Sequence, residues 1–306
     1  MIKRTLYFGN LAYLSMKNAQ LVLRAPGGED APPRTFPIED LGIVILDHKQ
    51  ITITQGLLER LLEWNCAVIT CDTAHMPAGL FLPLDGHTLQ SERFRAQVDC
   101  SKPLRKQLWQ QTVKAKIANQ AYALKKCVPS VIVDNMLAWV NEVRSDDADN
   151  LEGRAAAYYW RHFFPEENDF TRQREGDFPN NMLNYGYAIL RAIIARALVG
   201  SGLIPTLGIH HHNKYNAYCL ADDIMEPYRP WVDILVKNIY NEVSADGEPD
   251  ELTTDIKRRL LSIPTLDVYI AGKKRPLMVA AEITTASLAK CFGNGERFIL
   301  YPQFTP

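Results

Sequence analysis

The period of the hydrophobic pattern changes once along the 306-residue chain, close to residue 90. Before this point, apolar and β-branched residues form short runs that polar residues, glycine and proline interrupt, and each run is too short for a stable helix. A single helix is predicted at 57–64, where leucines lie three and four residues apart. The runs themselves predict strands at 5–8, 12–16, 21–23, 34–38, 42–46, 51–54 and 67–70.

A segment rich in Pro, Gly and His, at 75–90, is expected to be a loop, and after it the apolar spacing becomes helical. The sequence thus predicts an α+β protein: a small β-rich N-terminal domain at 1–80, a linker at 81–95 and a larger all-α domain at 96–306. Pro302 and Pro306 favour an extended tail over 288–306. Helices are predicted at 108–125, 155–164, 182–198 and 218–243.

The composition, 47% hydrophobic and 23% charged, is typical of a globular protein. The most apolar run, 188–204, carries Arg191 and Arg196, so no membrane span is expected. Because the first residues lead directly into strand-like sequence without an apolar signal segment, we expect a cytoplasmic protein. The six cysteines form no CxxC pair, which indicates neither disulfides nor a zinc ribbon.

A net charge of −1 argues against nucleic-acid binding, but the charges are segregated along the chain. Residues 101–130 contain seven basic residues, Lys114 and Lys116 among them, and no acidic one, whereas 134–152 is acid-rich. Such segregation can give a locally positive face that contacts DNA phosphates. A solvated helix surface is the alternative that stays open.

Two of the predicted helices carry residues that need an explanation. Glu152 and Arg154 lie in a first turn, where the helix dipole alone would favour an acid. Gly186 lies inside the next helix, where glycine costs about 1 kcal/mol relative to alanine. Close helix packing or a cleft where Asn184 and Tyr185 approach a ligand would each account for this glycine.

A histidine run, at 210–212, precedes Asp223 and Glu226, which are three residues apart and share a helical face. Two carboxylates on one face repel unless they share a cation or a proton, so this pattern indicates a divalent-metal site of Mn²⁺ or Mg²⁺ type. A zinc site built from the histidine run competes with it, although no HExxH-like spacing is present. Pro227 and Pro230 are expected to distort the helix.

Taken in order, these motifs resemble those of the CRISPR adaptation integrase family. That family has an acid followed by small and aromatic residues, then Asn-Tyr-Gly, then Gly-x-x-His, then Asp-x-x-Glu with Pro and Arg after it. The motif spacing, the His-His pair and the segment 109–120, with Lys116-Ile117 and Gln120, are most similar to members of type II systems. The corresponding residues here are Glu152, Asn184-Tyr185-Gly186, Gly208 to His211 and Asp223 to Arg229.

The resemblance implies a divalent-metal-dependent DNA integrase and endonuclease, which inserts short DNA fragments (spacers) into a CRISPR array by transesterification. It implies that Glu152, His211 and Glu226 are catalytic and bind Mg²⁺ or Mn²⁺, with Asp223 as an additional or supporting carboxylate. DNA contacts are expected from Arg154, Asn184, Tyr185, Lys214, Arg229, Lys114 and Lys116.

The resemblance also implies a homodimer formed through the β-rich domain. Its further implied partners are double-stranded DNA (the prespacer and the CRISPR repeat), a small ferredoxin-like adaptation protein and the system's effector nuclease. Two other functions stay open: a non-catalytic DNA-binding scaffold of the adaptation complex, and an unrelated metal-dependent hydrolase of a small molecule.

Overall fold

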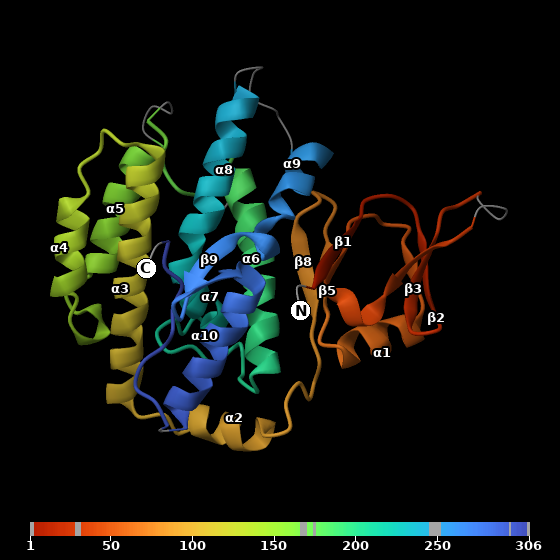
Figure 1. Ribbon diagram of the computed structural model, residues 1–306, viewed down its shortest axis with the longest axis horizontal. Helices are drawn as coiled ribbons and strands as arrows, with labels where there is room; N and C mark the ends of the chain where they lie inside the picture. The colour runs from red at the N-terminus through yellow and green to blue at the C-terminus, as the bar shows by residue number, and fades with distance from the viewer. Residues whose placement is uncertain are drawn as a thin grey trace. The chain divides into compact units, whose positions relative to one another are not determined.

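The computed structural model describes residues 3–27, 32–165, 170–173, 176–244, 252–293 and 295–304 (Figure 1). The chain forms two compact units, Met1–Gln90 and Ser91–Pro306. The boundary between them falls inside the predicted linker, 81–95.

The N-terminal unit consists of two four-stranded sheets and one helix. The first sheet has the order β1-β5-β7-β8, with β8 antiparallel to the other three strands, and the second has the order β4-β3-β2-β6. Leu14, Leu41, Val44, Leu57 and Val68 from both sheets and the helix meet in one core. The elements are β1 (Arg4–Phe8), β2 (Tyr13–Lys17), β3 (Gln20–Arg24), β4 (Arg34–Pro37), the 3₁₀ turn η1 (Ile38–Asp40), β5 (Leu41–Leu46), β6 (Thr52–Ile53), α1 (Gln55–Glu63), β7 (Ala67–Cys71) and β8 (Pro77–Phe81).

Strand β8 lies in the segment 75–90 that was expected to be a loop. Pro77 is tolerated there because β8 is at the edge of its sheet, where one row of N–H groups needs no partner strand. A Cβ on Gly79 would lie 2.4 Å from Thr70 Oγ1 on β7, so a side chain at this position would force Thr70 to move. Two residues typical of loops are therefore features of an edge strand.

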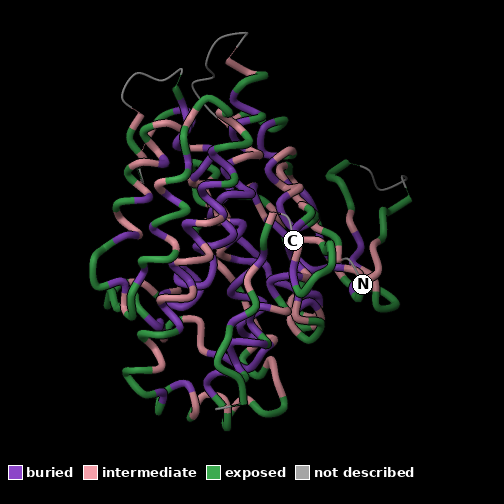
Figure 2. Tube along the Cα trace, turned by 60° about the vertical axis from the view of Figure 1, so that its left-hand side comes forward, coloured by how far each residue is buried: buried purple, intermediate pink, exposed green. Residues whose placement is uncertain are grey.

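The C-terminal unit is mostly helical and is built around α6 (Figure 1). Figure 2 shows the buried residues running through its interior and the exposed ones along its outer helices. The helices are α2 (Gln90–Val98), α3 (Lys102–Cys127), α4 (Asp134–Glu142), η2 (Ser145–Asp147), α5 (Leu151–Phe163), α6 (Asn180–Gly200), α7 (Cys219–Met225), η3 (Glu226–Tyr228), α8 (Arg229–Val243), α9 (Thr254–Leu260), η5 (Ile263–Thr265) and α10 (Leu277–Phe292).

Helix α6 is the core helix of this unit. Of the described helices it alone is long and apolar enough to cross a membrane, and 78% of its most apolar window is buried inside the protein. A Cβ on Gly186 would lie 2.6 Å from Val232 Cγ1 on α8. Close packing of α6 on α8 therefore explains this glycine.

The predicted helix at 218–243 is divided into α7, η3 and α8. Pro227 has no N–H to continue the ladder of α7, and Pro230 lies in the first turn of α8, where the N–H is not needed. The break leaves Glu226 at the junction, at the end of one helix and the start of the next turn.

The end of the chain differs from the predicted extended tail over 288–306. Helix α10 continues to Phe292, and the described residues after it form no helix. Ile299 and Pro302 are buried, and Gln303 pairs with Tyr269 of the antiparallel ribbon β9 (Asp267–Ile270) and β10 (Lys273–Pro276). This ribbon adds strands to a domain that was predicted to be all-α; Pro306 lies outside the described residues.

Candidate active site

A left-handed turn before α5 positions Glu152. Asp146, Asp147 and Asn150 have φ values of 67°, 50° and 51°, a conformation that Asp and Asn adopt more readily than other side-chain-bearing residues. The Asp147 carboxylate accepts hydrogen bonds from the backbone N–H groups of Leu151, at 3.0 Å, and Glu152, at 2.9 Å. The first turn of α5 is thereby capped, and Glu152 is held by its backbone.

The loop that carries His211 wraps around the carboxylate of Asp223. Backbone N–H groups of Ile209, His210 and His211 donate to Asp223 at 2.7, 3.0 and 3.2 Å, and His211 Nδ1 lies 2.5 Å from Asp223 Oδ1. A Cβ on Gly208 would lie 2.4 Å from the carbonyl oxygen of His211, so the loop needs glycine there. Asp223 itself is fully buried.

This arrangement gives Asp223 and His211 different capacities. Both oxygens of Asp223 are occupied by the loop, whereas His211 is held through Nδ1 and keeps Nε2 for a ligand. A carboxylate behind the imidazole is the usual support of a metal-ligating histidine. The hydrogen bond to Asp223 raises the pKa of His211, although burial lowers it.

Glu152 and Glu226 meet at the side chain of Lys116, from the buried face of α3. Lys116 Nζ is paired with Glu152 Oε1 and lies 2.6 Å from Glu226 Oε2. Burial lowers the pKa of Lys116, but the charges of Glu226 and Glu152 outweigh it and the pKa is raised. The Glu226 Oε2 atom accepts no well-oriented hydrogen bond, so its contact with Lys116 is one of charge.

A chain of contacts leads from Glu226 into the core. Arg229 Nη2 lies 2.9 Å from Glu226 Oε1, and the guanidinium lies over the Tyr187 ring at 4.6 Å. The hydroxyl groups of Tyr187 and Tyr159 donate to the two oxygens of Asp233, at 2.5 and 3.0 Å. Burial raises the pKa of Asp233 to about 7, despite these hydrogen bonds.

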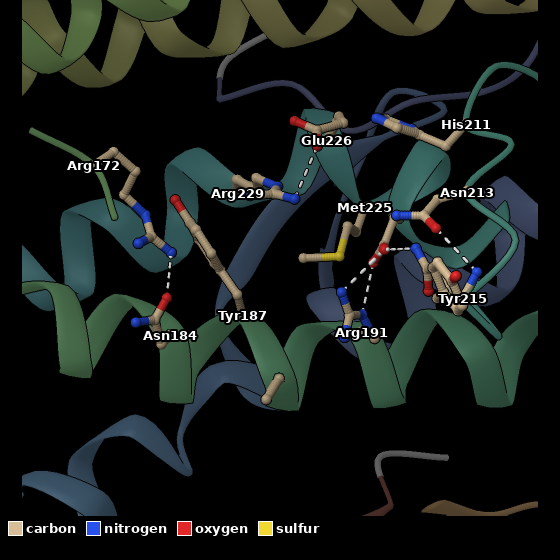
Figure 3. A pocket seen from close by; sticks show the side chains of 13 residues that line it. Arg172, Asn184, Tyr187, Arg191, His211, Asn213, Tyr215, Met225, Glu226 and Arg229 are labelled. Atoms are coloured by element: carbon tan, nitrogen blue, oxygen red, sulfur yellow. Dashed lines mark hydrogen bonds and ion pairs between the residues drawn. The ribbon is translucent and has the colours of Figure 1, made fainter. Parts of the chain in front are cut away.

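A polar cleft of about 520 Å³ opens beside Glu226 and His211 (Figure 3). Its floor is α6, which contributes Asn184, Tyr187 and Arg191, and Arg172 and Arg229 approach the Tyr187 ring. The Arg191 guanidinium is paired with both oxygens of Asp222, at 2.6 and 3.0 Å.

Arg172 is a residue that the sequence analysis missed. Its Nη1 and Nη2 atoms donate to Asn180 Oδ1 at 3.1 Å and to Asn184 Oδ1 at 2.7 Å, and its guanidinium lies 5.1 Å from the Tyr187 ring centre. Among the described residues, no carboxylate is paired with it. An arginine that uncharged groups hold in a cleft is suited to an anionic ligand. A lone arginine in the polar segment 165–179 carries no such signal in the sequence.

Two of the residues predicted to contact DNA lie inside the protein. Tyr185 is completely buried on the core side of α6, and Lys116 is 6% exposed and engaged by two carboxylates. The α3 face that carries Lys116 points inward, toward these two carboxylates.

The other predicted DNA contacts lie in different surroundings. Asn184 lines the cleft and accepts from Arg172, and Arg229 is engaged by Glu226. Arg154 lies 4.5 Å from the Trp139 ring, and Lys214 lies over the exposed Tyr215 at 4.8 Å. Lys114 lines a separate groove between α3 and the C-terminal segment.

The three adjacent histidines do not act together. The His210 ring stacks on Trp109, with centroids 4.1 Å apart and planes at 6°, whereas His211 faces Asp223 and His212 is exposed. In the part of the chain that the structure describes, no three His, Cys, Asp or Glu side chains are arranged to hold a metal ion. The histidine run therefore lacks the shared position that a zinc site built from it would need.

The donor chemistry around Lys116 nevertheless fits a divalent cation. Two carboxylates from different elements converge on one cationic centre, and an imidazole with its Nδ1 fixed lies on the same side of Glu226, at the cleft. Glu152, His211 and Glu226 are thus the residues that would hold a metal. The ammonium group of Lys116 occupies the position where the two carboxylates meet.

Comparison with known proteins identifies the family. Residues 6–261 match the family model described as CRISPR associated protein Cas1. The chain belongs to the Cas1 family. A CRISPR-associated endonuclease Cas1 from Neisseria meningitidis serogroup C (strain 8013) is 35% identical over 280 residues, which is 92% of this chain and 88% of that protein. The resemblance seen in the sequence is confirmed.

Solved structures agree on the Cas1 fold. A casposase bound to its integration product superposes with a TM-score of 0.77 at 22% identity, over 98% of this chain and 92% of the casposase. A Cas1 protein from Thermotoga maritima gives a TM-score of 0.75 at 18% identity, over 97% and 99% of the two chains. A chain of a Cas6-RT-Cas1–Cas2 complex gives 0.73 at 23% identity, over 99% of this chain and 36% of that chain.

Proposed function

We propose that this protein is a divalent-metal-dependent DNA integrase with endonuclease activity, which inserts short DNA fragments into a CRISPR array. The observation that carries the proposal is the convergence of Glu152 and Glu226 on one cationic centre beside His211, whose other nitrogen is fixed by Asp223. Family membership and a relative named as an endonuclease support the same activity.

The reaction is a transesterification at a DNA phosphodiester. A DNA 3′-hydroxyl attacks phosphorus, a new P–O bond forms, the bond to the leaving 3′-oxygen breaks, and the hydroxyl proton passes to that oxygen through solvent. A bound Mg²⁺ or Mn²⁺ would supply Lewis-acid stabilisation of charge on the phosphate. Water in place of the 3′-hydroxyl gives hydrolysis, which accounts for the endonuclease activity.

The side chains of this protein contribute orientation and charge. Asp223 fixes the tautomer and the direction of His211, and Arg229 holds Glu226 through Oε1 so that Oε2 faces Glu152 and Lys116. Arg172 supplies a positive charge in the wall of the cleft next to these groups, where no described carboxylate forms an ion pair with it. A phosphate of the DNA strand in this cleft would accept hydrogen bonds from it.

The proposed partners are double-stranded DNA, a second copy of the chain and a small ferredoxin-like adaptation protein, with the effector nuclease of the system as a further one. One structural neighbour is part of a Cas6-RT-Cas1–Cas2 complex, which supports a partner of Cas2 type. Exposed Tyr13, Met16 and Phe81 on strands of the N-terminal unit support this unit as the dimerisation domain.

The test is integration of a short 3′-hydroxyl DNA fragment into a supercoiled plasmid that carries a repeat, with the small partner protein and Mn²⁺. Glu152→Ala and His211→Ala are compared with wild type and with Glu142→Ala, an exposed glutamate on α4 outside the cleft. We expect wild type and Glu142→Ala to insert the fragment, and both site variants to fail while they still bind DNA.

The other outcomes separate the competing functions. Site variants as active as wild type would show that the active site is elsewhere. A wild-type protein that binds DNA but is inert with every divalent metal would instead support the non-catalytic scaffold.

A further inference from the structure

Lys116 is the most unusual buried charge in the helical unit. Its side chain is 8% exposed, yet it reaches two carboxylates that belong to other elements, Glu152 of α5 and Glu226 of η3. A lysine is rarely buried unless it is paired, and here it is paired twice. Lys116 itself lies on α3, so both ion pairs join different elements and neither is a contact within one helix.

The charge balance of this cluster is complete without a metal ion. Glu152 and Glu226 carry two negative charges, and Lys116 and Arg229 carry two positive ones. A divalent cation that joined this set would leave two positive charges uncompensated in a partly buried region. Positive charges repel each other strongly in a region where little water is present to screen them.

The two cations of the cluster differ in how firmly they are held. Arg229 contacts Glu226 Oε1 and lies over the Tyr187 ring, which is itself tied to buried Asp233. Lys116 has a flexible four-carbon stem; it donates a hydrogen bond to Glu152 Oε1, whereas its contact with Glu226 Oε2 lacks the geometry of a hydrogen bond. Of the two, Lys116 is the one that can withdraw without disturbing the cleft.

We propose that Lys116 is a built-in counter-cation, and that its ammonium group and a divalent metal ion compete for the same two carboxylates, Glu152 and Glu226. In the metal-free protein, Lys116 prevents these carboxylates from repelling each other and keeps them facing. When the metal ion binds, the ammonium group leaves the carboxylates but stays on α3 beside the cleft. This inference rests on the proposed function, since it takes both carboxylates as metal ligands.

The test is the affinity of the metal-free full-length protein for Mn²⁺, measured by calorimetry and by the spin-resonance signal of free Mn²⁺. Lys116→Met keeps the length of the side chain and removes its charge. We expect it to bind Mn²⁺ about tenfold tighter than wild type, or more, because the competing cation is gone. We also expect a lower melting temperature without metal and a larger rise on adding Mn²⁺ than in wild type.

Two further variants locate the effect. Lys125→Met removes an exposed lysine from the same helix, whose ammonium group donates to the carbonyl oxygen of Pro129, and should leave Mn²⁺ affinity unchanged. Adding Glu226→Gln to Lys116→Met removes one of the two carboxylates and should abolish the gain. If Lys116→Met does not fold, Lys116→Gln, which keeps a hydrogen-bond donor, takes its place.

The inference is overturned if Lys116→Met binds Mn²⁺ no more tightly than wild type does. If wild type still integrates DNA in that case, the proposed function stands and only the competition is wrong. Absence of Mn²⁺ binding in both proteins overturns the inference as well, and the integration assay then decides separately on the proposed function.

Discussion

The Asp223 carboxylate shows how one buried residue can organise a site without touching the substrate. It accepts hydrogen bonds from three backbone N–H groups and is in hydrogen-bond contact with His211 Nδ1. The loop and the imidazole are therefore fixed by the same side chain. The sequence indicated Asp223 as an additional or supporting carboxylate near the metal. Its contacts favour the supporting role.

Asp223→Asn should therefore reduce metal-dependent DNA cleavage by about 10- to 100-fold, the usual cost of losing the carboxylate behind a ligating histidine. The hydrogen bond and the charge of Asp223 raise the pKa of His211, so the variant should also lower that pKa. The acidic limb of the pH–rate profile is then expected at lower pH than in wild type. A profile of unchanged shape, with only the maximum reduced, would assign Asp223 a purely structural role.

Asp233 gives a second prediction, on stability. Its pKa is about 7 in the folded protein and about 4 in an unfolded chain, so the folded state holds the proton more tightly. This group therefore favours folding below pH 4, and its contribution is lost as pH rises from 4 to 7. Asp233→Asn stays neutral, so its melting temperature relative to wild type should be higher at pH 8 than at pH 5.

Melting curves of both proteins between pH 5 and pH 8 check this expectation. Asp255→Asn, which changes an exposed carboxylate on α9, is the matched control. Parallel pH dependences of wild type and Asp233→Asn would mean that Asp233 is ionised in the fold throughout this range.

Among the elements, the C-terminal segment is the one whose role is least evident from sequence. Asn119 on α3 donates from Nδ2 to the carbonyl oxygens of Pro227 and Pro302, at 2.8 and 3.0 Å, and the hydroxyls of Thr112 and Tyr301 lie 2.7 Å apart. The segment is thereby joined to the helix that carries Lys116 and to the turn that carries Glu226. It is part of the support of the site.

Asn119→Ala should lower the stability of the helical unit by about 2–4 kcal/mol, because two buried carbonyl groups lose their donor. Near-UV circular dichroism during urea unfolding would measure the change. Asn141→Ala, on the exposed surface of α4, provides the comparison and should have almost no effect. An equal midpoint for the two variants would contradict the supporting role of the segment.

Long elements with one clear period were predictable, and elements defined by their partners were not. Helices α3, α5 and α6 and strands β5 and β7 follow local patterns and lie close to their expected positions. Helix α10 is apolar on most sides because it is buried, so it shows no polar face by which to be recognised. Strand β8 was hidden by Pro77 and Gly79, which only its edge position and its contact with Thr70 explain.

The proposed site shows the same division between local patterns and contacts across the chain. Glu152, His211 and Glu226 were indicated by motif order, and the structure brings Glu152 and Glu226 to one cation and His211 to the same cleft as Glu226. Arg172 and the inward direction of Lys116 depend on contacts between segments far apart in the chain. No local pattern encodes such contacts.

For the whole molecule, a net charge of −1 means that attraction to DNA must come from local groups rather than from the overall charge. We expect DNA affinity to fall by about 10- to 100-fold between about 50 and 200 mM salt, as for a protein with a few phosphate contacts. Arg172→Ala should reduce the slope of log affinity against log salt by about 1.

Fluorescence anisotropy with a labelled DNA duplex over a salt series would measure this slope. Arg258→Ala removes an exposed arginine that is paired with Asp255 outside the cleft, and should leave the slope as it is in wild type. Equal slopes for Arg172→Ala and wild type would remove Arg172 from the DNA path.

The turn at Gly208 also constrains how this protein can change over evolutionary time. A Cβ there would lie 2.4 Å from the His211 carbonyl oxygen and 2.8 Å from Asp223 Oδ2, so any side chain is excluded while the loop encloses that carboxylate. A lineage that lost Asp223 would lose the reason for the glycine, and one that replaced the glycine would open the loop and expose the aspartate. The two positions should be inherited as a pair, and lineages should keep both or replace both.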